Sequence, residues 1–119
     1  MKTIIIKESE WLRGVPLQGL LRDSKTGRKC CLGFVCMALG FKPDEIEDIG
    51  MPSDLEFEVE RPVPTLTIKQ GNGEYNFPQD TEFAKEASSF NDAAMDDEER
   101  KFWLKILAHD AGYDFQFVP

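Results

Sequence analysis

The sequence predicts one small α+β domain over residues 1–119, with the terminal segments paired as strands in a small sheet and the helices packed on one face. Three observations support this. The composition, 41% hydrophobic and 30% charged, is that of an ordinary folded domain. β-Branched residues fill segment 3–7, and apolar and polar residues alternate over 113–118. Stretches with helical spacing of apolar residues lie between these two ends.

The apolar stretch 30–39 predicts a helix that is buried all round, because apolar side chains occur on every face of it. Gly33 lies inside this helix, where glycine costs about 1 kcal/mol relative to alanine. We therefore expect another backbone to approach Gly33 closely. Gly40 is placed to end the helix.

The middle of the chain predicts strands. Leu55, Phe57 and Val59 alternate with glutamates over 55–60, which is the pattern of a half-buried strand. Residues 65–69 and 74–77 flank a Gly-Asn-Gly turn and predict a hairpin.

Two helices are predicted in the last third, the first beginning at Thr81 and the second after Asp96. Asp96 has Glu99 three residues later, the pattern of a capping box. The second helix is expected to bury Phe102, Trp103, Ile106 and Leu107 on one face. The predicted core consists of Leu32, Phe34, Val35, Leu39, Phe102, Ile106 and Leu107. Truncating Leu39 or Ile106 to alanine is expected to cost about 2–5 kcal/mol.

Charge is distributed unevenly along the chain, whose net charge is −8. Residues 1–43 carry eight basic and three acidic groups, a net +5, and residues 44–119 carry six and nineteen, a net −13. The acidic part repels nucleic acid and membrane surfaces, so we expect neither as a partner. The first residues lack the apolar region of a signal peptide, and no apolar run approaches the roughly 20 residues that span a bilayer. We expect a cytoplasmic protein with reduced cysteines.

Several segments form a recognisable set of motifs: Trp-Leu-Arg-Gly (11–14), Leu-Leu-Arg (20–22), Gly-Arg-Lys-Cys-Cys-Leu-Gly-Phe (27–34), Asn-Asp (91–92), Asp-Glu-Glu-Arg (97–100) and Phe-Gln-Phe-Val (115–118). Together they resemble a family of small bacteriophage and prophage proteins. The acidic middle, 43–80, carries little of the resemblance. The family has no assigned activity, so it implies only a setting, a phage protein in a bacterial cytoplasm. Small accessory proteins of phages bind host or phage proteins and can block host defences.

The leading hypothesis is a non-enzymatic phage accessory protein that binds a host or phage protein and could thereby inhibit a host defence factor. It predicts buried cysteines and an exposed acidic or aromatic surface. The expected partner-binding residues are Asp96, Asp97 and Glu98. The acidic runs also suit mimicry of DNA phosphates, and a homo-oligomer remains open.

The first alternative is a module that binds a small anionic ligand such as a nucleotide through Arg13, Arg22, Arg28 and Lys29. These residues precede a helix whose first N–H groups lack intrahelical partners and form the positive end of its dipole. The spacing is not that of a P-loop. Pairing of the basic third with the acidic part of the chain is the simpler interpretation of the same residues.

The second alternative is a cysteine-dependent enzyme. Cys30 and Cys31 follow two basic residues at a helix start, where a thiol pKa falls, and His109 is the single histidine that could act as base. The simpler interpretation is that free cysteines fill a core. Adjacent cysteines do not have the spacing of a zinc site, so we predict neither a metal nor a cofactor.

Overall fold

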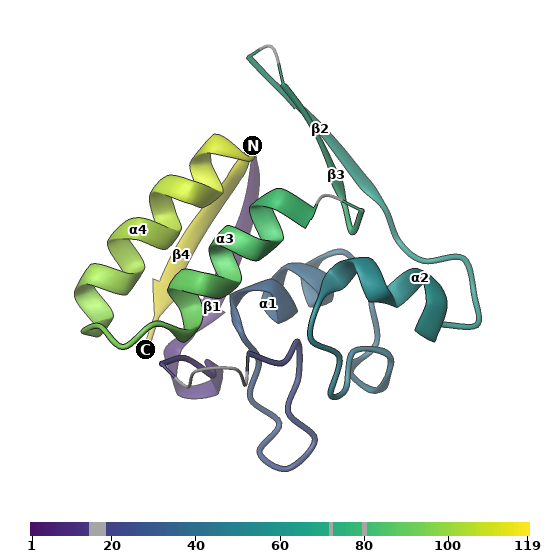
Figure 1. The fold of residues 1–119 in the computed structure, drawn as a ribbon, viewed down its shortest axis with the longest axis horizontal. Helices are drawn as coiled ribbons and strands as arrows, with labels where there is room; N and C mark the ends of the chain where they lie inside the picture. Colours follow the sequence, from purple (N-terminus) through teal and green to yellow (C-terminus); the bar gives the residue numbers. More distant parts are fainter. Residues whose placement is uncertain (15–18, 72, 80) are drawn as a thin grey trace.

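A computed structural model describes residues 1–14, 19–71, 73–79 and 81–119 and shows the predicted α+β fold (Figure 1). The two ends of the chain, β1 (Lys2–Lys7) and β4 (Tyr113–Val118), pair in parallel as a two-stranded sheet. The predicted hairpin is also present, formed by β2 (Leu66–Gln70) and β3 (Gly73–Phe77), and it projects from the body of the molecule.

The helices α3 (Thr81–Asp92) and α4 (Asp97–Asp110) lie side by side over one face of the β1–β4 sheet, as predicted (Figure 1). The helix α1 (Cys31–Ala38) packs against β1 and α3. Because side chains alternate along a strand, Ile4 and Phe115 point into this layer and are buried, whereas Ile5 and Gln116 face the uncovered side of the sheet.

The expectations for the helix at 30–39 are confirmed. Its first six residues are buried, including Leu32, Phe34 and Val35, although Leu39 is only half-buried. A Cβ on Gly33 would lie 1.9 Å from the carbonyl oxygen of Leu21, so a neighbouring backbone does approach the glycine. Gly40 has a φ of +102° directly after the helix, a conformation that glycine adopts without a steric penalty.

The predicted strand at 55–60 is wrong. Residues Leu55–Glu58 form a short helix, α2, after a 3₁₀ turn at Pro52–Asp54. Leu55 is buried but Phe57 is 86% exposed, so the alternating pattern does not mark a pleated strand. Pro52 provides the physical reason, since its fixed φ favours a helical turn at the position where it begins.

The predicted inner face of the last helix is also wrong. Phe102 is 57% exposed, Trp103 39% and Ile106 40%. Leu107 is half-buried, so it only partly meets the expectation. The residues that α4 buries, spaced four apart, are Arg100, Leu104 and Ala108. The apolar pattern alone predicted the wrong buried face for α4, because the face that is buried contains Arg100, an arginine with hydrogen-bonded guanidinium N–H groups.

Candidate functional site

A buried polar junction around Asn91 joins segments that lie far apart in the sequence. The Asn91 Oδ1 accepts hydrogen bonds from Trp11 Nε1 at 2.8 Å and from the Cys31 backbone N–H at 3.1 Å. Its Nδ2 donates to the Leu12 carbonyl at 2.9 Å, and its own carbonyl accepts from Gly14 N–H at 2.8 Å. Asn91 thus ties the N-terminal segment and the start of α1 to the end of α3.

This junction occupies the helix end that the anion hypothesis needs. The Cys31 N–H is bonded to Asn91, and the Cys30 N–H donates to the Leu20 carbonyl at 3.1 Å. Side-chain oxygen and carbonyl groups therefore already satisfy these two N–H groups at the start of α1.

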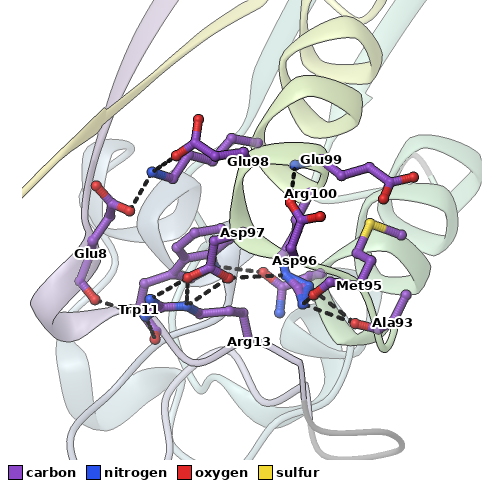
Figure 2. A network of polar contacts seen from close by, with 12 residues as sticks. Glu8, Trp11, Arg13, Ala93, Met95, Asp96, Asp97, Glu98, Glu99 and Arg100 are labelled. Atoms are coloured by element: carbon purple, nitrogen blue, oxygen red, sulfur yellow. Dashed lines mark hydrogen bonds and ion pairs between the residues drawn. The ribbon is translucent and has the colours of Figure 1, made fainter.

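The four basic residues of the anion hypothesis contact different parts of the protein. Arg13 forms an ion pair with Asp97 (Nη2–Oδ2 2.8 Å), donates to two backbone carbonyls, and lies 4.8 Å from the centroid of the Trp11 ring (Figure 2). Arg22 pairs with Glu47. The Lys29 ammonium lies 4.9 Å from the centroid of the Phe34 ring, and Arg28 is exposed. Arg13 and Arg22 therefore pair with carboxylates of the acidic part of the chain, as the simpler interpretation expects. An anion site formed by the four basic residues stays a prediction.

The three acidic residues expected to bind a partner also make different contacts within the protein. Asp96 is the predicted N-cap of α4, and its Oδ1 accepts from the Glu99 N–H at 2.9 Å. Asp97 accepts from Arg13, which holds the pKa of this carboxyl below its usual value. Glu98, with its side chain 89% exposed, pairs with Lys101 at 3.3 Å (Figure 2). Of the three, Glu98 presents its carboxylate outward.

Arg100 is a buried residue that the sequence did not reveal. Its Nη1 and Nη2 donate to the Ala93 carbonyl at 3.1 and 3.0 Å, and Nη2 also donates to the Met95 carbonyl at 2.7 Å (Figure 2). Its Nε lies 3.8 Å from an Asp97 oxygen without a hydrogen bond. The guanidinium thereby fastens the loop between α3 and α4 to the first turn of α4.

The cysteines behave as core residues. All three are buried free thiols, and burial raises the pKa of Cys30 to about 12 and those of Cys31 and Cys36 well above the usual range. A nucleophilic thiol needs the opposite shift. His109 is exposed on α4, outside the core that holds the thiols. This arrangement disfavours the thiol-enzyme alternative. Among the described residues, no group of three or more His, Cys, Asp or Glu side chains could hold a metal ion.

An open groove of about 490 Å³ lies beside the end of α3. It is lined by Gly19, Met51, Lys85, Ser88, Ser89, Asp92, Ala93 and Ala94. Burial raises the pKa of the Asp92 carboxyl. None of the four basic residues of the anion hypothesis lines this groove.

The exposed side of α4 is unusually apolar. The ring of Phe102 meets that of Trp103 edge-on, with centroids 5.3 Å apart, and Trp103 stacks on Phe90 of α3 at 5.8 Å. Ile106 lies one turn after Phe102 on the same side. Phe90, Phe102, Trp103 and Ile106 are called the α3–α4 outer face below. Exposed carboxylates on the same two helices are those of Glu82, Glu86, Glu98, Glu99 and Asp110.

No protein-family model, curated protein or solved structure matches the chain. Within the described part, no helix is long and apolar enough to span a membrane.

Proposed function

We propose that this protein is a non-enzymatic accessory protein that binds another protein through the α3–α4 outer face. The observation that carries the proposal is the exposure of Phe102, Trp103 and Ile106 on one helix, although smaller side chains of that helix are buried. Single exposed apolar residues are ordinary, but a contiguous apolar patch with a polar rim is typical of protein–protein interfaces. Aromatic side chains also dominate binding energy at such interfaces.

The charge around this face favours a basic partner surface. Glu98 and Glu99 lie at the start of α4, Asp110 lies at its end, and Glu86 lies on the neighbouring helix. A net charge of −8 adds a long-range attraction for positive surfaces. The expected binding patch on the partner has an apolar centre flanked by lysines or arginines.

The biological setting comes from the resemblance to phage proteins. In that setting the partner is a host or phage protein, and inhibition of a host defence factor would follow if the bound protein covered a working surface. Buried cysteines and the internal pairing of Arg13 and Arg22 favour this function over a thiol enzyme or an anion-binding module.

The test compares two sets of apolar-to-serine variants in the bacterial host. The double variant Phe102→Ser/Ile106→Ser removes two side chains of the outer face, and Phe57→Ser removes an even more exposed phenylalanine on α2 as the control. Native mass spectrometry of the affinity-purified protein should show one partner at fixed stoichiometry with the wild type and Phe57→Ser. Titration of that purified partner should show binding weakened about thirtyfold or more in the double variant, the loss of a hot spot.

Equal binding of the partner by the double variant would refute the α3–α4 outer face as the binding surface. Recovery of no stoichiometric partner from the host would refute the proposed function itself. Activity of the purified partner with and without the protein then decides whether binding is inhibitory.

A further inference from the structure

A small pocket lies between the start of α3 and the end of α4, next to the hairpin strand β3. Its volume is about 170 Å³. Three carboxylates line it, those of Glu82, Glu86 and Asp110. Its aromatic and apolar walls come from Tyr75, Phe83 and Leu107. None of the described residues that line the pocket is basic, so its charge is entirely negative.

On α3, the pocket lies on the same side of the helix as the α3–α4 outer face. Residues four apart on a helix share one side, so Phe90, Glu86 and Glu82 form one line along α3. Phe90 belongs to the outer face through its stack on Trp103. The same line therefore passes from an aromatic ring of the outer face to two carboxylates of the pocket.

The helix α4 shows the same sequence of side chains along its exposed side. Phe102, Ile106 and Asp110 are spaced four apart, and the first two belong to the outer face. Figure 1 shows α3 and α4 running in opposite directions, so the start of α3 lies toward the end of α4. The outer face thus continues into the pocket and changes there from apolar to acidic.

Two of the three carboxylates are available to a ligand. Glu86 and Asp110 are exposed, and no ion pair among the described residues includes either of them. Lys85 is adjacent to Glu86 in the sequence, but it lines the groove beside the end of α3. Glu82 has an interaction of its own within the chain, so the negative charge left for a ligand is that of Glu86 and Asp110.

We propose that this pocket accepts one arginine side chain of the protein that docks on the α3–α4 outer face. The inference rests on the proposed function and adds to it the residue by which the partner is recognised. Arginine is among the residues that dominate binding energy at protein interfaces.

The size and walls of the pocket favour a guanidinium group. A volume of about 170 Å³ is below the roughly 300–1,000 Å³ of sites for drug-sized ligands, so a single side chain fits better than a cofactor. The described residues include no group of His, Cys, Asp and Glu suited to a metal ion. A guanidinium is planar, stacks on aromatic rings such as Tyr75, and can donate to both carboxylates at once. The ammonium of lysine is more strongly hydrated and lacks this geometry.

The helix geometry also gives the spacing on the partner. With a rise of about 1.5 Å per residue, Glu86 and Glu82 lie about 6 and 12 Å along α3 from Phe90. On a partner helix laid between α3 and α4, the arginine would therefore stand roughly four to eight positions from the apolar residue that covers Phe90 and Trp103.

The first test needs no partner protein. N-acetyl-arginine methylamide is titrated into the isotope-labelled protein, and N-acetyl-citrulline methylamide, which has the same shape without the charge, is the control. The arginine compound should give saturable NMR shifts at the amides of Glu86, Leu107 and Ala111, and the citrulline compound should not. Absence of a saturable shift at about 20 mM, or equal shifts with citrulline, would overturn the proposal.

The lysine compound tests the aromatic wall. N-acetyl-lysine methylamide carries the same charge but cannot stack, so it should bind at least about threefold more weakly than the arginine compound. Equal binding would mean that the pocket recognises charge alone, and would overturn the preference for arginine.

A pair of neutral variants locates the site. Glu86→Gln/Asp110→Asn should abolish the shifts caused by the arginine compound. Glu58→Gln/Glu60→Gln changes the net charge equally at exposed positions in and after α2 and should leave them unchanged. Equal behaviour of the two double variants would overturn the assignment to this pocket.

The same variants separate this inference from the proposed function once the partner is purified. Glu86→Gln/Asp110→Asn should weaken binding of the partner about tenfold or more, because a charged pair in the interface is lost, and the α2 control should not. Loss of binding in Phe102→Ser/Ile106→Ser with none in Glu86→Gln/Asp110→Asn would overturn the arginine pocket and leave the outer face as the binding surface. Loss in neither would refute the outer face itself.

Discussion

The two faces of α4 reverse the usual distribution of polar and apolar side chains. The inner face buries Arg100 together with Leu104 and Ala108, and the outer face exposes Phe102 and Ile106. The buried guanidinium is accommodated because two carbonyls of the preceding loop accept its hydrogen bonds. On the outer face, Phe102 meets only its neighbour Trp103 edge-on among the described aromatic rings, and Trp103 stacks on Phe90.

This comparison separates stability from recognition within one helix. Residues that fasten the fold are those with partners in the chain, whether they are polar or apolar. Large apolar side chains left in water contribute little to folding and are available for another protein. Stability measurements on matched variants of the two faces can therefore test this distinction.

The largest loss is expected at the Asn91 junction. Asn91→Ala removes the acceptor of Trp11 Nε1 and Cys31 N–H and the donor to the Leu12 carbonyl, leaving three polar groups buried without these bonds. Each such group costs about 1–3 kcal/mol, so the free energy of unfolding should fall by about 3–5 kcal/mol. Urea denaturation measures this change. Ser89→Ala, at an exposed position of α3, should change it by less than about 0.5 kcal/mol. A loss below about 1 kcal/mol at Asn91 would contradict the junction.

A smaller contrast is expected between the two faces of α4. Leu104→Ala removes a fully buried side chain and should cost about 2–5 kcal/mol. Ile106→Ala removes one that is 40% exposed and should cost less than about 1 kcal/mol, which replaces the larger loss expected from the sequence. Equal losses in urea denaturation of the two variants would mean that the outer face contributes to the fold as much as the inner one.

The sequence predicted the parts of the fold that depend on local patterns. The terminal strands, the hairpin, the all-round buried helix and the Asp96 cap each follow from spacing or from the stereochemistry of one residue. The close approach at Gly33 was also predictable, because glycine inside a helix is costly unless a neighbour needs the space.

The errors arise where distant contacts decide the outcome. The apolar residues around Phe57 alternate with glutamates as in a strand, but the turn that begins at Pro52 and the burial of Leu55 favour a helix. The roles of Asn91 and Arg100 depend on partners that other segments bring to them, up to 80 residues away for Trp11 and Asn91. No periodicity in the sequence marks such residues, and for α4 the apolar pattern pointed to the outer face.

The smallest effect is expected at the ion pair between Arg13 and Asp97. The hydrogen bond from Arg13 holds the pKa of Asp97 below its ordinary value of 3.8 in the folded state. The pair therefore adds stability above that pH, and this stability is lost as the pH falls through the lower folded pKa. Asp92 has the opposite effect on the pH dependence of stability. Burial raises the pKa of its carboxyl, so its contribution to the free energy of unfolding becomes more favourable as the pH falls.

A double-mutant cycle isolates this pair from Asp92. Arg13→Met, Asp97→Asn and the double variant should give a coupling energy below about 1 kcal/mol at pH 7, since the Asp97 side chain is 40% exposed. The coupling should shrink as Asp97 becomes protonated in acid, and urea denaturation at each pH measures it. A coupling near zero at pH 7, with a loss of stability in Arg13→Met alone, would mean that Arg13 stabilises the fold through its carbonyl bonds and its contact with Trp11, and not through Asp97.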